Sequence, residues 1–152
     1  MLMRTLALFI LAAVLTGCAS PTKYNFDVSL RNATSGPLTV GFVKKGPPNE
    51  SQWASPESYT ALPPSRQPTE WGEVIAAGKT AEVHVTGEIY PGAAAYLRVY
   101  AGEHPLNELL AISRGTGGRL DLVLAPGRNN AFVITDPNGK LAAKLFRFEA
   151  VR

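Results

Sequence analysis

The sequence predicts an all-β protein, an antiparallel β-sandwich of seven or eight strands that is immunoglobulin-like or transthyretin-like, with one long Pro/Trp-rich loop. Short stretches in which apolar and polar residues alternate recur along the chain, and this alternation is typical of half-buried strands. Turn residues separate these stretches, and no segment between them has helical periodicity. These observations favour a sandwich over an α/β unit.

The expected strands follow one another at short intervals. They are 24–31, 38–42, 79–87, 93–102, 119–125, 129–136 and 143–150. The last two form a predicted hairpin across Asp136-Pro137-Asn138-Gly139, a run of strong turn residues. Residues 106–113 are an eighth strand or, if Pro105 opens it, one helical turn.

The alternation also assigns side chains to the two faces of the strands. On this basis the core contains Val83, Val85, Leu97, Val99, Leu122 and Phe146, whereas Glu82, His84, Arg98 and Asp121 face solvent. Outside the signal-like N-terminus described below there is no cysteine. No disulfide therefore braces the domain, and an apolar core must stabilise it.

One segment, residues 46–72, differs from the rest in composition. It holds six of the twelve prolines and both tryptophans, and it is too long for a plain hairpin connection. Proline favours an extended, polyproline-like geometry there. Trp53, Tyr59 and Trp71 either pack back onto the sandwich as a lid or present an aromatic surface that binds a partner.

The N-terminus has the features of a secretory signal. Arg4 precedes ten apolar residues, 6–15, and small residues follow them. A helix of ten residues rises only about 15 Å, whereas the hydrocarbon of a bilayer is about 30 Å thick. The segment is therefore too short for an ordinary membrane span.

Cys18, the only cysteine, ends the stretch Leu15-Thr16-Gly17-Cys18, which resembles the lipobox of bacterial lipoproteins. The resemblance implies that residues 1–17 are a signal peptide, that acyl chains on Cys18 attach the protein to a membrane, and that 18–23 form a short tether to a single domain, 24–152. Ala19 stands where an aspartate commonly retains lipoproteins in the inner membrane. The resemblance thus implies the periplasmic face of the outer membrane.

Charge and composition exclude some partners. Removal of residues 1–17 leaves 135 of the 152 residues, the size of one ordinary domain, and lowers the net charge from +3 to +2. That charge is too small to indicate nucleic-acid binding. We expect no cofactor, because the two histidines have no neighbours at metal-ligand spacing and no local motif supplies a nucleophile.

Three arginines, Arg114, Arg119 and Arg128, are candidates for binding an anionic glycan or lipid headgroup if they gather at one end of the sandwich. The sequence as a whole predicts a lipid-anchored, non-catalytic binding or assembly module of the cell envelope, with a protein or glycan partner. In size and architecture it is similar to the outer-membrane lipoproteins of the type VI secretion apparatus, called TssJ, a similarity that assigns no residue. A hydrolase of envelope glycans is the enzymatic alternative.

Overall fold

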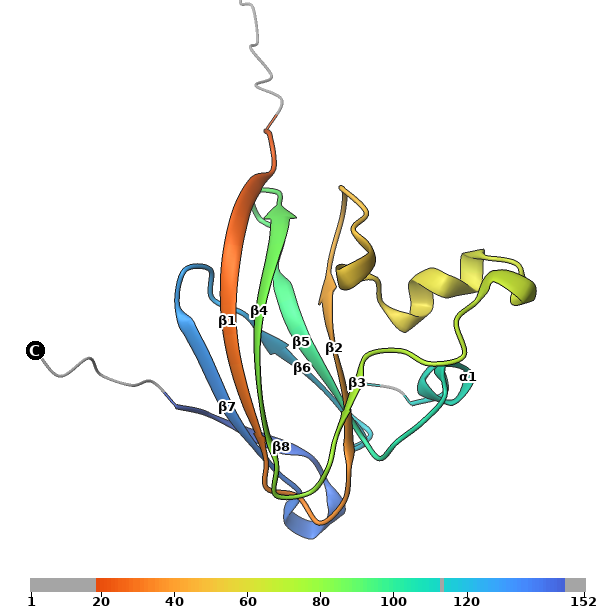
Figure 1. Cartoon of the computed structure of the whole chain (residues 1–152), viewed down its shortest axis with the longest axis vertical. Helices are drawn as coiled ribbons and strands as arrows, with labels where there is room; N and C mark the ends of the chain where they lie inside the picture. The colour runs from red at the N-terminus through yellow and green to blue at the C-terminus, as the bar shows by residue number, and fades with distance from the viewer. Residues whose placement is uncertain (1–18, 113, 147–152) are drawn as a thin grey trace, which may run out of the picture.

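The computed structural model describes residues 19–112 and 114–146, and in these residues the chain forms two four-stranded sheets. The sheets face each other as two layers, with a small group of short helices beside them (Figure 1). The predicted all-β sandwich is therefore confirmed. Within the described residues no helix is long and apolar enough to cross a membrane.

The first sheet has the strand order β4-β1-β7-β8. These strands are β4 (Thr80–Ile89), β1 (Thr22–Asn32), β7 (Asn129–Thr135) and β8 (Ala142–Phe146). Strand β1 pairs with β4 in antiparallel fashion but with β7 in parallel, so the sheet is not purely antiparallel. Strands β7 and β8 form the predicted hairpin. The two edge strands of this sheet are therefore β4 and β8.

The second sheet has the strand order β3-β2-β5-β6 and is antiparallel throughout. Its strands are β3 (Glu73–Ile75), β2 (Leu38–Lys44), β5 (Ala95–Ala101) and β6 (Arg119–Val123). Strand β3 is only three residues long and pairs only with residues 38–40 of β2. Among the described residues, the rest of β2 therefore has no strand on that side.

Residues 46–72, which we call the lid segment, contain three short 3-10 helices. These are η1 (Ser51–Trp53), η2 (Pro56–Ala61) and η3 (Pro64–Arg66). The residues between them keep extended geometry, such as φ −76° and ψ 159° at Ser55. The predicted extended geometry is thus wrong for the three helical turns and correct for the residues between them. Proline is compatible with both, because it fits the first turn of a helix as well as an extended chain.

The main core lies between the two sheets. Phe26, Val28 and Leu30 of β1 meet Leu97 and Val99 of β5 there, all at most 4% exposed. Val85 is buried as predicted, whereas Val83 and Leu122 are only partly buried, because β4 and β6 are edge strands. The side chain of Phe146, and residues 147–150 of the predicted last strand, lie outside the described residues.

A second, smaller apolar cluster lies on the outer face of the second sheet. It consists of Val43, Trp71, Tyr100, Leu106 and Leu109. Leu106 and Leu109 belong to α1 (Leu106–Leu109), so of the two alternatives for 106–113 the helical turn is correct, as far as residue 112, where the described residues stop. The lid segment and α1 together cover this face (Figure 1).

Two strand boundaries differ from those predicted. Strand β1 begins at Thr22 rather than Tyr24, which shortens the expected tether, because the backbone of Thr22 and Lys23 pairs with β4. Strand β3 was missed, because three residues, two of them exposed, give no readable alternation. A further short turn, η4 (Pro137–Gly139), occupies the predicted hairpin turn.

Candidate functional site

Trp53 closes the upper part of the gap between the edges of the two sheets. Its ring is 2% exposed and packs edge-on against Phe26 and Phe42. Its indole N–H donates to the carbonyl of Thr86 on β4 over 2.8 Å. Gly87 makes room for the ring, because a Cβ there would lie 2.6 Å from the indole.

Trp71 fixes the far end of the lid segment on the opposite face of β2. Its ring is 7% exposed, meets Tyr100 edge-on and donates from Nε1 to the carbonyl of Ala54 over 2.7 Å. A Cβ at Gly41 would come within 2.6 Å of the ring. A glycine inside a strand often marks such a close approach. Each tryptophan ring therefore packs over a strand glycine, Trp53 over Gly87 and Trp71 over Gly41.

An ion-pair network joins the lid segment to the second sheet. Arg98 of β5 donates to Asp121 of β6 over 2.8 Å and to Glu57 of η2 over 2.7 Å. Arg119 pairs with the same two carboxylates. Four charges of alternating sign therefore hold η2 against the sheet.

The surroundings of the two carboxylates in this network lower their pKa values. Burial opposes the ionisation of Asp121, but hydrogen bonds from Arg119 and Arg98 outweigh it, and the pKa of this carboxyl lies below its ordinary value. For Glu57, burial is likewise outweighed by hydrogen bonds from its own backbone and from Arg98, and its pKa is lowered. Both groups therefore stay ionised and paired over the neutral pH range.

The hydroxyl of Tyr100 lies beside this network. It is fully buried and has no hydrogen-bond partner among the described residues, and burial raises its pKa. The Arg119 guanidinium lies 5.9 Å from the centre of the ring. The ring packs edge-on against Trp71 in the second apolar cluster, so this side chain is part of the lid's support.

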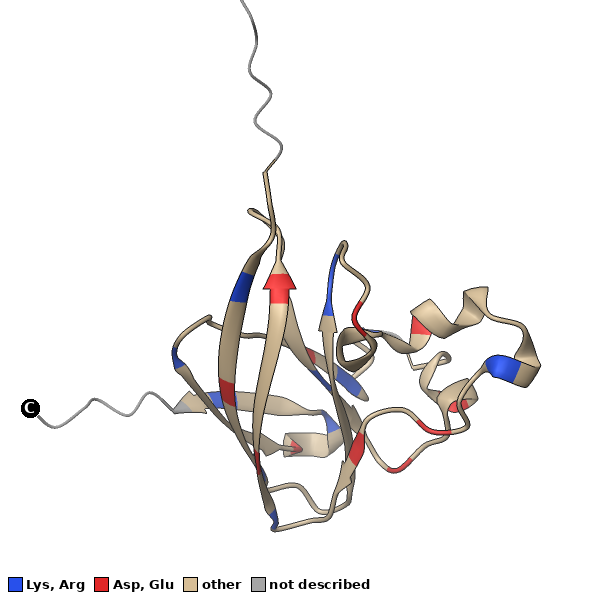
Figure 2. Cartoon of the chain, turned by 45° about the horizontal axis from the view of Figure 1, so that its top comes forward, with Lys and Arg blue, Asp and Glu red and all other residues tan. Residues whose placement is uncertain are grey.

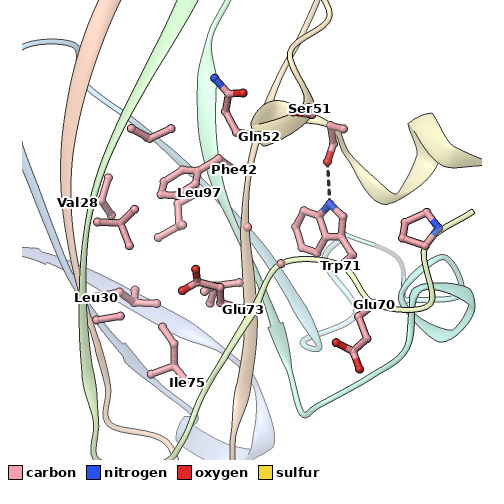
Figure 3. Close-up of a pocket in the computed structure, with 18 of the residues that line it drawn as sticks. Val28, Leu30, Phe42, Ser51, Gln52, Glu70, Trp71, Glu73, Ile75 and Leu97 are labelled. Atoms are coloured by element: carbon pink, nitrogen blue, oxygen red, sulfur yellow. Dashed lines mark hydrogen bonds between the residues drawn. The ribbon is translucent and has the colours of Figure 1, made fainter.

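An apolar cleft of about 420 Å³ opens at the sandwich edge below Trp53. Figure 3 shows Val28, Leu30 and Leu97 deep in it and Phe42 and Ile75 on the side of the second sheet. Strand β4 supplies the opposite wall with Ala81, Val83 and Val85. The cleft exists because β3 is too short to close this edge.

The rim of the cleft is polar and acidic. Glu70, Glu73 and His84 border it, and no lysine or arginine is among its lining residues. Figure 2 shows the acidic residues that follow the end of the lid segment into β3. Within the described residues neither glutamate has an ion-pair partner.

The free edge of β4 is covered along its upper half only. The carbonyl of Thr86 accepts from the side chains of Trp53 and Gln52. The N–H of Glu88 donates to the Glu50 carboxylate over 3.2 Å, and its carbonyl accepts from the Lys44 ammonium over 2.8 Å. Lys44 and Glu50 also pair with each other.

The structure separates the residues that the sequence groups as aromatic partner-binding candidates. Trp53 and Trp71 are buried, so these two side chains act as supports of the lid. Tyr59 is half-buried and borders the cleft. Trp71 also contributes to the cleft lining, but of the three side chains Tyr59 is the most exposed.

The three candidate anion-binding arginines do not form one site. Arg119 is engaged with Asp121 and Glu57. Arg128 follows the other end of β6, in the turn before β7, and Arg114 precedes β6. Both are exposed, but β6 separates them. Cys18 lies outside the described residues.

Arg98 and Asp121, predicted to face solvent, are instead covered by the lid segment, with side chains 10% and 8% exposed. That prediction was wrong, because alternation assigns a side chain to a face without showing what lies over the face. Glu82 and His84 are exposed as predicted.

The cleft residues on β4 and β3 are functional candidates that sequence reasoning missed. The one available signal was Gly41, an interior glycine of β2 opposite Trp71. Among the described residues no group of three or more His, Cys, Asp or Glu side chains is placed to hold a metal ion. Comparisons with protein-family models, with curated proteins and with solved structures find no match for this chain.

Proposed function

We infer that the protein is a lipid-anchored, non-catalytic binding module of the bacterial cell envelope, held on the periplasmic face of the outer membrane by acyl chains on Cys18. The observation that carries the binding role is the open apolar cleft between β4 and β2. Loops and edges on a rigid sandwich commonly carry function, and a concave apolar site with a few polar groups is typical of ligand binding.

The position of the N-terminus supports the anchoring role. Three residues lie between Cys18 and Thr22, where β1 begins, and the four residue steps from one to the other span at most about 14 Å. The same end of the sandwich carries the turns at 45–50, 90–94 and 124–128. It also exposes Lys23, Lys45 and Arg128, cations that favour an anionic lipid surface.

This arrangement sets the direction of the cleft. Thr22 pairs with Ile89 at the end of β4, and Val83 lies six residues further along that strand. At about 3.4 Å per residue, the cleft is about 20 Å from the tethered end. It therefore opens sideways, towards a partner that lies beside the protein along the membrane.

The roles of the ionisable residues support a non-catalytic protein. Arg98, Arg119, Asp121 and Glu57 hold the lid segment in place. His104 contacts the Glu108 carboxylate over 2.9 Å and the carbonyl of Ala101 over 2.8 Å, which fixes the start of α1. These groups have structural partners rather than a shared opening to a substrate.

Replacement of the anchoring cysteine tests the proposal. Cys18→Ser should abolish the acyl mass and move the protein from the membrane fraction to the soluble fraction, while its circular dichroism stays unchanged. Ser20→Ala, two residues beyond, is the matched control and should remain acylated. A wild-type chain without acyl mass, or a Cys18→Ser chain that stays in the membrane, would contradict the anchoring role.

A further inference from the structure

The lower half of the β4 edge combines a bare backbone with the apolar cleft. The backbone groups of Thr86 and Glu88 that bind side chains point away from β1. Because direction along a strand repeats every two residues, the backbone groups of Glu82 and His84 point the same way. In the described part of the chain no second strand pairs with β4, and the side chains that bond to its backbone reach only Thr86 and Glu88.

The two halves of the β4 edge differ in how far side chains cover their backbone groups. Proteins protect exposed strand edges, because unpaired N–H and C=O groups bind any extended chain. Here four side chains, those of Lys44, Glu50, Gln52 and Trp53, cover the upper half. The protection stops at Thr86, where the cleft begins.

We propose that an extended peptide segment of a partner protein, with alternating basic and apolar residues, adds to the edge of β4 at residues 81–86 as a further strand. A strand placed there would lie about 4.8 Å from β4 and would cover the opening of the cleft. Its inward side chains would enter the space lined by Val83, Phe42 and Ile75. Backbone hydrogen bonds to Glu82 and His84 would set its register.

Charge selects the chemistry of the partner. Glu70 and Glu73 lie on the rim opposite β4, and Glu82 lies on the outer face of β4. All three are exposed, and none has an ion-pair partner among the described residues. Lysine or arginine side chains at the outward positions of the added strand meet Glu82 directly, and Glu70 and Glu73 on the opposite rim attract a basic strand over a longer range, whereas acidic side chains are repelled.

The inference rests on the proposed binding role but is independent of acylation. The probe is a capped eight-residue peptide of alternating lysine and valine, and the protein is the full chain in lipid nanodiscs. Binding is measured by calorimetry, and the site is located by hydrogen exchange of the backbone amides. We expect new protection of the amides of Glu82 and His84, whose backbone groups face the open edge, whereas those of Val83 and Val85 face β1 and are protected already.

N-methylation of the peptide tests strand addition directly. Two versions of the peptide carry methyl groups on alternate amides, one on each set. In an added edge strand one set faces β4 and the other faces solvent, so one version should bind at least about 10-fold more weakly and the other almost unchanged. Equal affinities for the two versions would overturn strand addition, although binding as such would stand.

Two further measurements address charge and self-association. Glu73→Gln combined with Glu82→Gln should weaken peptide binding and reduce its salt dependence, whereas Glu103→Gln, an exposed carboxylate outside the cleft lining, should change neither. Tighter binding of an alternating glutamate–valine peptide would overturn the assigned chemistry. Protection of the Glu82 and His84 amides without peptide, in a self-associated chain, would show that a second copy occupies the edge and would also overturn it.

Discussion

The outer face of each sheet carries a cross-strand pair of a basic side chain and an aspartate, but only the pair on the second sheet is buried. On the first sheet, His84 and Asp27 lie 2.6 Å apart with side chains 60% and 69% exposed. On the second, Arg98 and Asp121 lie 2.8 Å apart with side chains 10% and 8% exposed. Both pairs bridge neighbouring antiparallel strands. The difference in exposure therefore arises from the lid segment, which covers only the second pair.

This difference determines what each pair contributes. An exposed ion pair typically contributes between 0 and about 1 kcal/mol, because water screens the charges. A buried pair is strongly coupled to its surroundings, and loss of one partner leaves an uncompensated charge in the interior. The covered face should therefore be sensitive to substitution and to acid, while the open face should tolerate both.

Removal of the lid's aromatic support should have the largest effect. Trp71→Ala deletes a buried ring from the cluster on the second sheet, and we expect the free energy of unfolding to fall by about 3–5 kcal/mol. Trp71→Phe is the conservative control: it keeps a ring but loses the hydrogen bond to Ala54, and should cost less. Urea denaturation measures both, and a loss under about 1 kcal/mol for Trp71→Ala would show that the lid does not stabilise the fold.

A matched pair of substitutions compares the two faces directly. Arg98→Gln leaves Asp121 buried with only Arg119 as a cationic partner, and should lower the free energy of unfolding by about 3 kcal/mol. His84→Gln on the open face should change it by no more than about 0.5 kcal/mol. Equal effects of the two substitutions, measured by urea denaturation, would remove the distinction between a covered and an open face.

The sequence predicts the sheets well and their surroundings poorly, for physical reasons. Alternation identifies seven of the eight described strands, because one side of each faces an apolar core. It misses β3, which is too short to alternate, and it does not reveal the parallel pairing of β1 with β7, because pairing between distant strands leaves no local pattern.

The candidate site is still harder to predict, because the cleft forms where strand pairing and side-chain cover stop short. The cleft depends on the shortness of β3 and on side chains of the lid segment that cover only half of β4. Composition marks the lid segment through its prolines and tryptophans, but not the face that it covers. Alternation thus assigns Arg98 to solvent, and composition leaves Trp53 as either a lid residue or a partner-binding one, whereas in the structure both side chains are buried.

Acid should affect the two faces unequally, and this is the smallest of the expected effects. The pKa values of Asp121 and Glu57 in the folded chain lie below their ordinary values of 3.8 and 4.5. The unfolded chain therefore binds more protons than the folded chain as the pH falls below about 5, so the stabilisation is complete above that pH and is lost as the pH falls through the lowered pKa values.

The comparison that isolates the network is wild type against Arg98→Gln, because Glu50 and Asp136 also have lowered pKa values and contribute to acid sensitivity in both chains. Arg98 is one of the donors that lower the pKa values of Asp121 and Glu57. Its loss should therefore bring these pKa values closer to those of the unfolded chain.

Between pH 5 and pH 3 the free energy of unfolding should consequently fall less in Arg98→Gln than in the wild type, whereas His84→Gln should follow the wild type over the same pH range. Urea denaturation at intervals of half a pH unit measures the three slopes. Parallel slopes for wild type and Arg98→Gln would show that the charges under the lid segment do not control its response to acid.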